Sequence, residues 1–471
     1  MSTVPDVSYD AVVVVPGLMG SRLVETETDT ELWGFTTMLK YSWLWLGSGP
    51  YAKLAVTPQE RAGQVGRVTA TNALTSPAAL PVLRGFEPYT RLLKRARESV
   101  VKPGAVCEFA YDWRLPVEHN ARLLAKAARE HLDRWRADEV HKGREAPRLV
   151  IAAHSMGGLL TRALAVVQGE GDTPVVTPDI RAAVTLGTPF RGSVKSAHLL
   201  SSGGGAPRFL HEKRLREVAR TMPGVYDVLP RYRCVEDVSK VRTLTPADVA
   251  RIGGDDELAQ AAADFFDRVR DESIPGHRLV IGTRQRTWQS LVLKDGLVVP
   301  SSEYFEWDGD EPKLGPDNRP VRRARDGDGT VARDAAVVDG VTAQYLPQQH
   351  GALAKSAEGV DGTAAVITEI ELGAPMGVTP AGVDVPDVVE AGETWAIEIT
   401  GLDKPTDAGC EVYDAGAPGK LVDMPPVQRA GDRLEARLSV DAPGVYRVEV
   451  SAGGASPVSQ LVLAVEPDAG A

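Results

Sequence analysis

Residues 149–164, LVIAAHSMGGLLTRAL, decide the fold. The first part of this stretch is an apolar run, which is typical of a buried β-strand, and the last part places apolar residues on one side of a helix. Ser155 lies in the turn between them, with the small residues Ala153 and Gly157 two positions away on either side. A tight turn of this kind presents the serine hydroxyl at a helix N-terminus, where the helix dipole and free N–H groups favour negative charge.

The order of strand, serine turn and helix resembles the nucleophile elbow of α/β-hydrolases. Ala153 stands where the common form of the motif has glycine, and alanine is small enough for the turn. The resemblance implies that Ser155 is a nucleophile. The alternative interpretation is that Ser155 only caps the helix that follows the buried strand.

Apolar runs elsewhere in the chain extend this pattern. Buried strands are predicted for residues 11–15, 181–186 and 277–283, and an amphipathic helix is predicted for residues 119–135. Buried strands that alternate with amphipathic helices indicate an α/β fold with a mostly parallel sheet. A less regular stretch at about residues 194–275 is predicted to be a mainly helical cap insertion.

The composition changes after about residue 373. Proline, glycine, valine and threonine become frequent, and short runs of alternating hydrophobicity are separated by turn residues. This pattern predicts a small all-β, immunoglobulin-like sandwich over residues 376–467. It follows a predicted α/β-hydrolase domain over residues 1–373.

The bulk composition excludes several classes of protein. The chain has 471 residues and a formal net charge of -11, which argues against nucleic acid as a partner because a polyphosphate needs a basic face. Three cysteines do not make a disulfide framework, and no pair has metal-ligand spacing. No signal peptide and no apolar stretch approaching about 18 residues is found. The expected location is therefore cytoplasmic.

A serine hydroxyl needs a base to become nucleophilic, and the base needs an acid to orient it. In α/β-hydrolases the chain order is serine, then acid, then histidine. Four histidines follow Ser155, namely His198, His211, His277 and His350. His350 comes just after a short apolar run, as expected for a base on the loop past the last core strand. His350 is therefore the predicted base, and a surface or capping role is the alternative.

The acid is predicted within residues 323–337, RARDGDGTVARDAAV. Asp328 opens a turn that would deliver a carboxylate to the histidine, and Asp326 is the rival two residues upstream. An acidic glycine-rich turn or a loose calcium loop is the alternative, but the EF-hand pattern fails because no glutamate follows at the right distance. We favour Asp328, and we predict no metal site.

The oxyanion hole is expected to consist of backbone amides. One is the amide of Met156, directly after the nucleophile, and the other comes from the loop after an early strand. Residues 15–21, VPGLMGS, supply that loop, and Leu18 is the predicted donor. This chemistry requires no cofactor.

Several strings carry a wider resemblance, in a consistent order along the chain: VVVVPGLMGSRL, FAYDWRLP, AAHSMGGLL, TLGTPFRGS, DGDGTV and QHGAL. Over most of residues 10–365 they resemble the lecithin:cholesterol acyltransferase family, which includes lysosomal phospholipases and phospholipid:diacylglycerol acyltransferases. The resemblance implies a catalytic triad of Ser155, Asp328 and His350. It also implies that the substrates are lipid acyl esters, in particular glycerophospholipids.

Aromatic residues are candidate substrate contacts. Phe190 lies at the C-terminal end of a predicted strand, where α/β sites form, and is expected either to line an acyl pocket or to pack in the core. Trp33, Trp43 and Trp45 lie in the apolar segment 31–46. This segment is interpreted either as an interfacial loop that contacts lipid or as packing of the cap.

We therefore expect a serine-dependent acyl-ester hydrolase or acyltransferase that acts on lipids, with peripheral membrane contact and no transmembrane anchor. A carboxylesterase or thioesterase for small soluble acyl groups is the first alternative. The second is a non-catalytic adaptor that binds a protein partner through the β-sandwich. The sequence does not separate water from a lipid alcohol as the acceptor of the acyl group.

Overall fold

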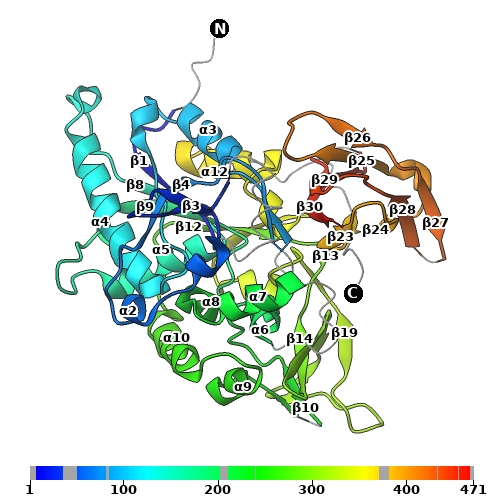
Figure 1. Cartoon of the computed structure of the whole chain (residues 1–471). Coiled ribbons are helices and arrows are strands. Elements are labelled where there is room, and N and C mark those ends of the chain that lie inside the picture. Colours follow the sequence, from blue (N-terminus) through cyan, green and yellow to red (C-terminus); the bar gives the residue numbers. More distant parts are fainter. Residues whose placement is uncertain are drawn as a thin grey trace.

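A six-stranded sheet lies at the centre of the computed structural model (Figure 1). Its strands, in spatial order, are β21 (Thr342–Leu346), β12 (His277–Gly282), β9 (Ile180–Leu186), β8 (Leu149–His154), β1 (Ala11–Val15) and β7 (Val106–Glu108). All neighbouring strands are parallel, so the predicted α/β fold is confirmed. The structure describes residues 7–35, 50–80, 84–201, 210–238, 240–370, 381–431, 433–453 and 456–466.

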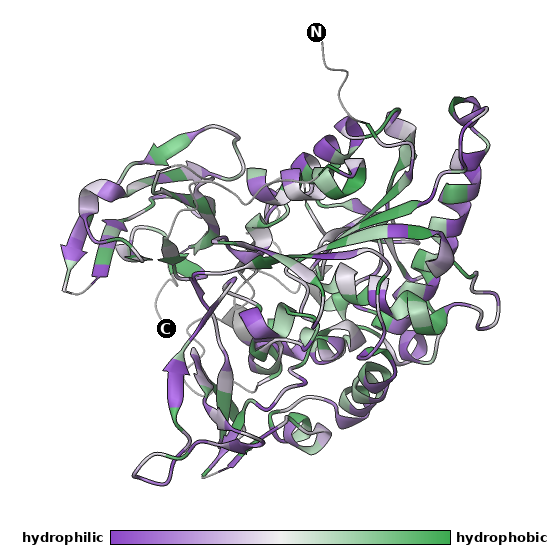
Figure 2. Ribbon diagram, turned by 180° about the vertical axis from the view of Figure 1, so that it is seen from behind, coloured by the Kyte–Doolittle hydropathy of each residue, from purple (hydrophilic) through white to green (hydrophobic). Residues whose placement is uncertain are grey.

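The central strands are buried because helices cover both faces of the sheet. All residues of β1 and β8 are buried. On one side α4 (Val117–Arg136) packs against α5 (Met156–Val167), and on the other α3 (Thr90–Glu98) packs against α12 (Ala357–Thr368). Figure 2 shows the apolar strands inside and polar residues on the outer helices. Cover on both faces explains why these strands read as continuous apolar runs. The helix predicted for residues 119–135 is confirmed as α4.

The residues after β9 form a mainly helical insertion. Its helices are α6 (Val194–Leu200), α7 (Leu210–Ala219), α8 (Pro223–Asp227), α9 (Pro246–Arg251) and α10 (Asp256–Val269). It also contains β10 (Val235–Asp237) and β11 (Lys240–Arg242), and β10 pairs with β14 (Ser290–Lys294) of a hairpin completed by β15 (Leu297–Ser301). The insertion is therefore continued by a hairpin that follows β12, beyond the predicted range of about 194–275.

Shorter elements surround these parts. They are β2 (Ser21–Glu25), β3 (Thr30–Trp33), β4 (Val68–Ala73), β5 (Ala78–Leu80), β6 (Arg84–Phe86), β13 (Gln285–Arg286), β16 (Glu303–Phe305), β17 (Trp307–Asp308), β18 (Glu311–Pro312), β19 (Arg322–Ala324), β20 (Asp326–Gly327), α2 (Pro58–Arg61) and α11 (Arg333–Ala336). The antiparallel sheet β3-β2-β4 directly follows the loop after β1, so it supports that loop.

The C-terminal part is built from two β-sheets. The first contains β22 (Gly382–Asp384), β24 (Trp395–Thr400), β28 (Arg433–Leu438) and β27 (Val427–Ala430), and the second contains β23 (Val388–Glu390), β30 (Val458–Val465), β29 (Gly444–Ser451), β25 (Gly409–Asp414) and β26 (Leu421–Asp423). The two sheets enclose a second hydrophobic core. The boundary predicted near residue 373 falls within residues 371–380, which lie outside the described residues.

Strand β30 is apolar on both faces, unlike the alternating strands around it. Val462 and Ala464 pack in the core of the C-terminal sandwich, whereas Leu461 and Leu463 belong to the main core. The strand contacts β6 and the short helix η5 (His350–Ala352). One strand therefore joins the two cores, and its continuous apolar sequence follows from having a packed surface on either side.

None of the helices in the described ranges is long and apolar enough to cross a membrane. The described residues also bring together no group of three His, Cys, Asp or Glu side chains suited to a metal ion. All three cysteines are free thiols, and Cys234 and Cys410 are buried.

Candidate active site

Ser155 lies at the junction of β8 and α5, in the turn predicted from the sequence. Its backbone has φ 53° and ψ −125°, an unfavourable conformation for a residue with a side chain. The turn is held from the side, because the Ser155 amide donates a hydrogen bond to the Leu186 carbonyl of β9 at 2.8 Å. Since α5 begins at Met156, the serine stands at the N-terminal end of this helix.

Two further side chains form a hydrogen-bonded chain with Ser155. His350 Nε2 lies 2.8 Å from Ser155 Oγ, and His350 Nδ1 lies 2.7 Å from Asp328 Oδ2. An ionised carboxylate can only accept, so Nδ1 carries a proton toward Asp328 and Nε2 can accept one from the serine hydroxyl. All three residues are buried. The structure thus brings together the three residues that the sequence analysis proposed as a triad.

The carboxylate of Asp328 is fixed by the backbone around it. Its Oδ1 accepts hydrogen bonds from the amides of Thr330 at 2.9 Å and Val331 at 2.6 Å. The Asp328 carbonyl accepts the His350 amide at 2.8 Å. Gly187 leaves room for the pair, because its φ is 59° and a Cβ there would lie 3.0 Å from both Asp328 Oδ2 and His350 Nδ1. A side chain at this position would push the two groups apart.

The competing candidates lie elsewhere. Asp326 accepts the Arg284 amide at 3.0 Å, and no hydrogen bond joins it to the described histidines. His277, at the beginning of β12, lies 2.8 Å from Thr185 Oγ1, and this hydrogen bond involves no triad residue. His198 packs its ring on Trp288 in the cap. The geometry therefore favours Asp328 over Asp326 and His350 over the other two histidines.

The loop after β1 lies directly against the elbow. A Cβ built on Gly17 would be 2.7 Å from Ser155 Cβ, so the backbone of this loop approaches the nucleophile closely. Within the described ranges, neither the Leu18 amide nor the Met156 amide donates to a protein acceptor. Met156 is the first residue of α5, whose first amides have no partner within the helix. The two predicted donors are therefore available to an oxyanion.

Tyr89 links this loop to the elbow. Its hydroxyl accepts the Gly17 amide at 2.9 Å and lies 2.7 Å from His154 Nδ1. His154 Nε2 in turn lies 3.0 Å from the His350 carbonyl. Burial, together with the neighbouring His350, lowers the pKa of His154 to about 3, so this ring is neutral. Its Nε2–H then donates to the His350 carbonyl, and the Tyr89 hydroxyl donates to Nδ1. No motif marked Tyr89, so the sequence analysis did not find it.

The C-terminal sandwich contacts the loop that carries His350. Gln348 Nε2 donates to the Pro457 carbonyl at 2.9 Å, and Gln348 Oε1 accepts the Ser459 amide at 3.0 Å. Both contacts are made just before or within β30, and Gln348 is buried. The residue two positions before the histidine is therefore held by the backbone of the sandwich.

Gln349, directly before His350, is held by a cluster of buried amides. Its Nε2 donates to the Val383 carbonyl at 2.7 Å and to Gln460 Oε1 at 3.0 Å. It also lies 3.2 Å from Gln285 Oε1, which accepts the Val383 amide at 2.9 Å. The cluster therefore combines groups from β13, β22 and β30, and two of these three strands belong to the sandwich.

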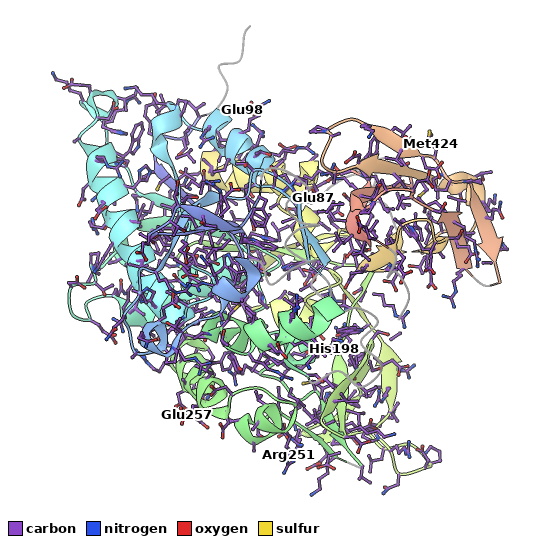
Figure 3. All side chains as sticks on the ribbon, in the orientation of Figure 1. Glu87, Glu98, His198, Arg251, Glu257 and Met424 are labelled. Carbon is purple, nitrogen blue, oxygen red and sulfur yellow. The ribbon has the colours of Figure 1, made fainter. Side chains whose placement is uncertain are left out.

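Glu87 is buried between the two parts of the chain (Figure 3). Its carboxylate accepts two hydrogen bonds from Arg447 of β29, at 2.7 and 2.8 Å, and one from Lys355 at 3.1 Å. Burial alone would raise the pKa of Glu87, but the Arg447 hydrogen bonds and the Lys355 charge hold it below the usual value. The ionised cluster joins the segment that carries Tyr89, the segment after His350 and the sandwich.

Phe190, a predicted substrate contact, is buried beside α5. Its ring centroid lies 5.5 Å from the His277 ring, and the Arg162 guanidinium lies 4.1 Å from the same centroid. These described ring contacts involve no triad residue. The structure therefore favours the core-packing alternative for Phe190, and its role in substrate binding stays a prediction.

The predicted interfacial tryptophans divide into two groups. Trp33 is fully buried, and its indole N–H donates to the Met19 carbonyl at 2.7 Å. A buried indole with a satisfied donor fits packing of the core, so the structure favours that alternative over lipid contact. Trp43 and Trp45 lie outside the described residues.

Comparison with known protein families identifies part of the chain. Residues 80–267 match the lecithin:cholesterol acyltransferase family. This segment resembles the lecithin:cholesterol acyltransferase family. The matched segment contains Tyr89 and Ser155 and ends before Asp328 and His350. The predicted resemblance is confirmed over this segment, and it supports an enzyme of the lipid acyl hydrolase or acyltransferase kind.

Several solved structures share weak similarity with this chain. They include a Tle4–Tli4 complex (TM-score 0.46, 15% identity, 76% of this chain and 97% of that chain). They also include the lipase BlEst2 of Bacillus licheniformis in its propeptide form (TM-score 0.33, 11% identity, 98% of this chain and 94% of that chain). A third is the phospholipase PlaB of Legionella pneumophila (TM-score 0.24, 11% identity, 79% of this chain and 85% of that chain). No curated protein matches the chain.

Proposed function

We propose that this chain is a serine-dependent acyl-ester hydrolase or acyltransferase that acts on glycerophospholipids through an acyl-enzyme on Ser155. The observation that carries the proposal is the hydrogen-bonded chain from Ser155 Oγ through His350 to Asp328, with distances of 2.8 and 2.7 Å. In such a chain the imidazole takes the serine proton, while the carboxylate keeps the correct tautomer and stabilises the imidazolium.

In the first half-reaction the acyl group moves from the substrate to the serine. His350 Nε2 takes the hydroxyl proton as Ser155 Oγ attacks the ester carbonyl carbon. The amides of Leu18 and Met156 donate to the oxyanion of the tetrahedral intermediate. His350 then returns the proton to the alcohol oxygen of the leaving group as the C–O bond breaks. The acyl group is left as an ester on Ser155.

The second half-reaction removes the acyl group. His350 takes a proton from the acceptor, whose oxygen attacks the acyl carbon, and the proton passes to Ser155 Oγ as the acyl–serine bond breaks. With water as the acceptor the product is a free fatty acid, and with a lipid alcohol it is a new ester. The same side chains and amides serve both acceptors.

The family match supports a lipid substrate, because it covers the elbow and most of the helical cap. Burial supports the same substrate class. Ser155 and His350 are each only 8% exposed, so a reacting ester has to enter a covered site where an acyl chain is shielded from water.

Fluorophosphonate labelling tests the nucleophile. We expect the wild-type chain to be labelled at Ser155 and the Ser155→Ala variant to remain unlabelled. The Asp326→Asn variant serves as a folded control that keeps the label. Equal labelling of wild type and Ser155→Ala would show that Ser155 is not the nucleophile.

Acyl release from defined esters tests the substrate class. We expect fatty acid or a new ester from long-chain phosphatidylcholine, with little turnover of acetyl or butyryl esters. Adding a long-chain alcohol distinguishes the acceptors, because a transferase then forms the fatty ester at the expense of free acid. A sharp preference for acetyl or butyryl esters would contradict the lipid substrate and favour a small-molecule esterase.

A further inference from the structure

A hollow of about 560 Å³ beside α5 and α10 is lined by five arginines. They are Arg162 of α5, Arg191 after β9, Arg231 and Arg233 before β10, and Arg270 after α10. Asp271 and Asp339 also line this arginine hollow, so the cations outnumber the carboxylates by five to two. This is unusual in a chain whose net charge is -11.

Three of these arginines have no carboxylate partner. Within the part of the chain that the structure describes, no ion pair is formed by Arg162, Arg191 or Arg231. Arg233 pairs only with the fully exposed Asp310, at 3.5 Å, and Arg270 pairs with neighbouring surface carboxylates. Asp227, Asp264 and Asp267 act on Arg231, and Asp271 acts on Arg162, without forming ion pairs with them. The positive charge of the hollow is therefore only partly compensated by the protein itself.

Buried donors with no acceptor also line the hollow. Arg162 is only 6% exposed, and its Nε has no hydrogen-bond partner among the described residues. Arg231 Nε and the hydroxyl of Tyr232 are also buried atoms with no hydrogen-bond partner among the described residues. Burial, with a contribution from the nearby Arg191, lowers the pKa of Arg162 to about 10. Buried polar groups are normally satisfied, so three such donors in the walls of one hollow are an unusual concentration of unused hydrogen-bonding capacity.

The arginines are held in place rather than left mobile. The Arg162 guanidinium lies 4.1 Å from the centroid of Phe190, and that of Arg231 lies 6.0 Å from the centroid of Phe266. The Arg191 backbone is fixed as well, because its carbonyl accepts the Arg231 amide at 2.9 Å. A site whose cations are already ordered loses little conformational entropy on binding an anion.

We propose that the arginine hollow binds a phosphoryl anion. A phosphomonoester or pyrophosphate group offers at least three acceptor oxygens and about two negative charges, which suits several convergent guanidinium groups better than a carboxylate does. The group can belong to a soluble phosphorylated compound or to a lipid headgroup, and both present the same chemistry.

This site is separate from the one that holds the reacting ester. The arginine hollow is lined by none of Ser155, Asp328 and His350. Arg162 follows Ser155 by seven residues on the same helix, which corresponds to ~10 Å along its axis. The bound phosphoryl group is therefore a second ligand of the chain, whatever acyl ester reacts at Ser155.

Isothermal titration with inorganic pyrophosphate tests a soluble ligand. The full-length Ser155→Ala chain is used, so that binding is measured without turnover. We expect saturable binding that weakens as ionic strength rises. Arg191→Gln and Arg231→Gln, each added separately, are expected to weaken it roughly tenfold or more, as for loss of a charge-assisted hydrogen bond. Arg191 is exposed, so its substitution should preserve folding, which thermal unfolding checks.

Arg251→Gln is the matched control for these variants. Arg251 lies on α9 at the outer side of the cap, and its side chain is 73% exposed (Figure 3). We expect this variant to bind pyrophosphate like its parent. Equal weakening in Arg251→Gln and Arg191→Gln would mean that the overall charge, and not the arginine hollow, controls binding.

Vesicle sedimentation tests the lipid source. The same chains are mixed with phosphatidylcholine vesicles, with or without phosphatidic acid. Binding that needs phosphatidic acid and is lost in Arg191→Gln assigns the hollow to a lipid headgroup, whereas pyrophosphate binding alone assigns it to a soluble phosphate compound. The proposal is overturned if neither probe binds or if binding does not depend on Arg191 and Arg231.

Discussion

Ser155 and His350 of the candidate site are held in different ways. The turn of Ser155 is made by one continuous stretch, β8 and α5, and its amide is fixed by the neighbouring strand β9. The loop of His350 depends on segments far away in the chain, including Ser459 and Gln460 of the C-terminal sandwich. The position of Ser155 is thus a local product of the sequence, whereas His350 is positioned by tertiary contacts.

The largest effect is expected at the acid that orients His350. Asp328→Asn should lower kcat by ~10⁴-fold, because the amide favours the wrong imidazole tautomer while the fold stays intact. Asp326→Asn is the matched control and should change kcat by roughly twofold at most. Ester hydrolysis kinetics and circular dichroism measure both. A larger loss in Asp326→Asn would assign the acid to the rival residue.

The next effect concerns the ionised cluster between the two parts of the chain. Arg447→Met removes both of the Arg447 hydrogen bonds to Glu87 and leaves the buried carboxylate with Lys355 as its one cationic partner, which should lower the free energy of unfolding by about 3 kcal/mol. Arg437→Met, which breaks a pair between an exposed arginine and Glu435 in the same sandwich, should leave the free energy of unfolding nearly unchanged. Urea unfolding measures both, and equal losses would show that the cluster adds nothing specific.

A smaller effect is expected from the amide cluster beside His350. Gln460→Ala removes one of the acceptors of Gln349 and should lower kcat roughly tenfold with little change in KM, because a displaced base misaligns the proton transfer. Fluorophosphonate labelling of Ser155 should slow by a similar factor. Gln428→Ala, on an exposed position of β27, should leave both rates unchanged. A change in KM without a change in kcat would show that Gln460 does not position His350.

The smallest effect near neutrality is the pH dependence of stability. Burial lowers the pKa of His154 to about 3 and of His277 to about 4, from 6.5. Below pH 6.5 the unfolded chain therefore binds protons that the native chain does not, and the free energy of unfolding falls as the pH falls. Burial raises the pKa of Asp227 from 3.8 to about 6. Between pH 3.8 and 6 the native chain therefore holds a proton that the unfolded chain releases, so this group makes the free energy of unfolding rise as the pH falls.

The sum of these three groups is a net uptake of about one proton on unfolding between pH 6 and 4. It corresponds to a loss of about 1.4 kcal/mol per pH unit. Denaturant unfolding at a series of pH values measures the slope. His277→Gln removes one of the two histidines and leaves His154, the neighbour of Ser155, in place. This variant should have a flatter slope, and an unchanged slope would exclude His277 as a contributor.

The sequence predicted the parts of the molecule that local patterns encode. The runs at residues 11–15 and 181–186 are apolar because the sheet buries both of their faces, and they were found for that reason. Ser155 was found because its turn needs a characteristic local sequence. His350 and Asp328 followed from chain order, and the structure places both next to Ser155.

The remainder depends on contacts that no local pattern records. Tyr89 and Glu87 stand in an unremarkable segment, and their roles arise from partners that are distant in the sequence. The arginines of the hollow come from four separate segments, so their convergence exists only in three dimensions. The pairing of β10 with β14, which are separated by β12 in the sequence, could not be predicted for the same reason.

The dependence of the His350 loop on β30 also has a consequence for the timing of synthesis. Gln460 is made 110 residues after His350, since 460 minus 350 is 110. At ~5–20 residues per second, the ribosome needs roughly 5–20 s to cover that interval. During this time the nascent chain contains Ser155, Asp328 and His350 but lacks the strand that steadies the base. The arrangement of these three side chains is therefore completed late, when the ribosome has nearly finished the sandwich.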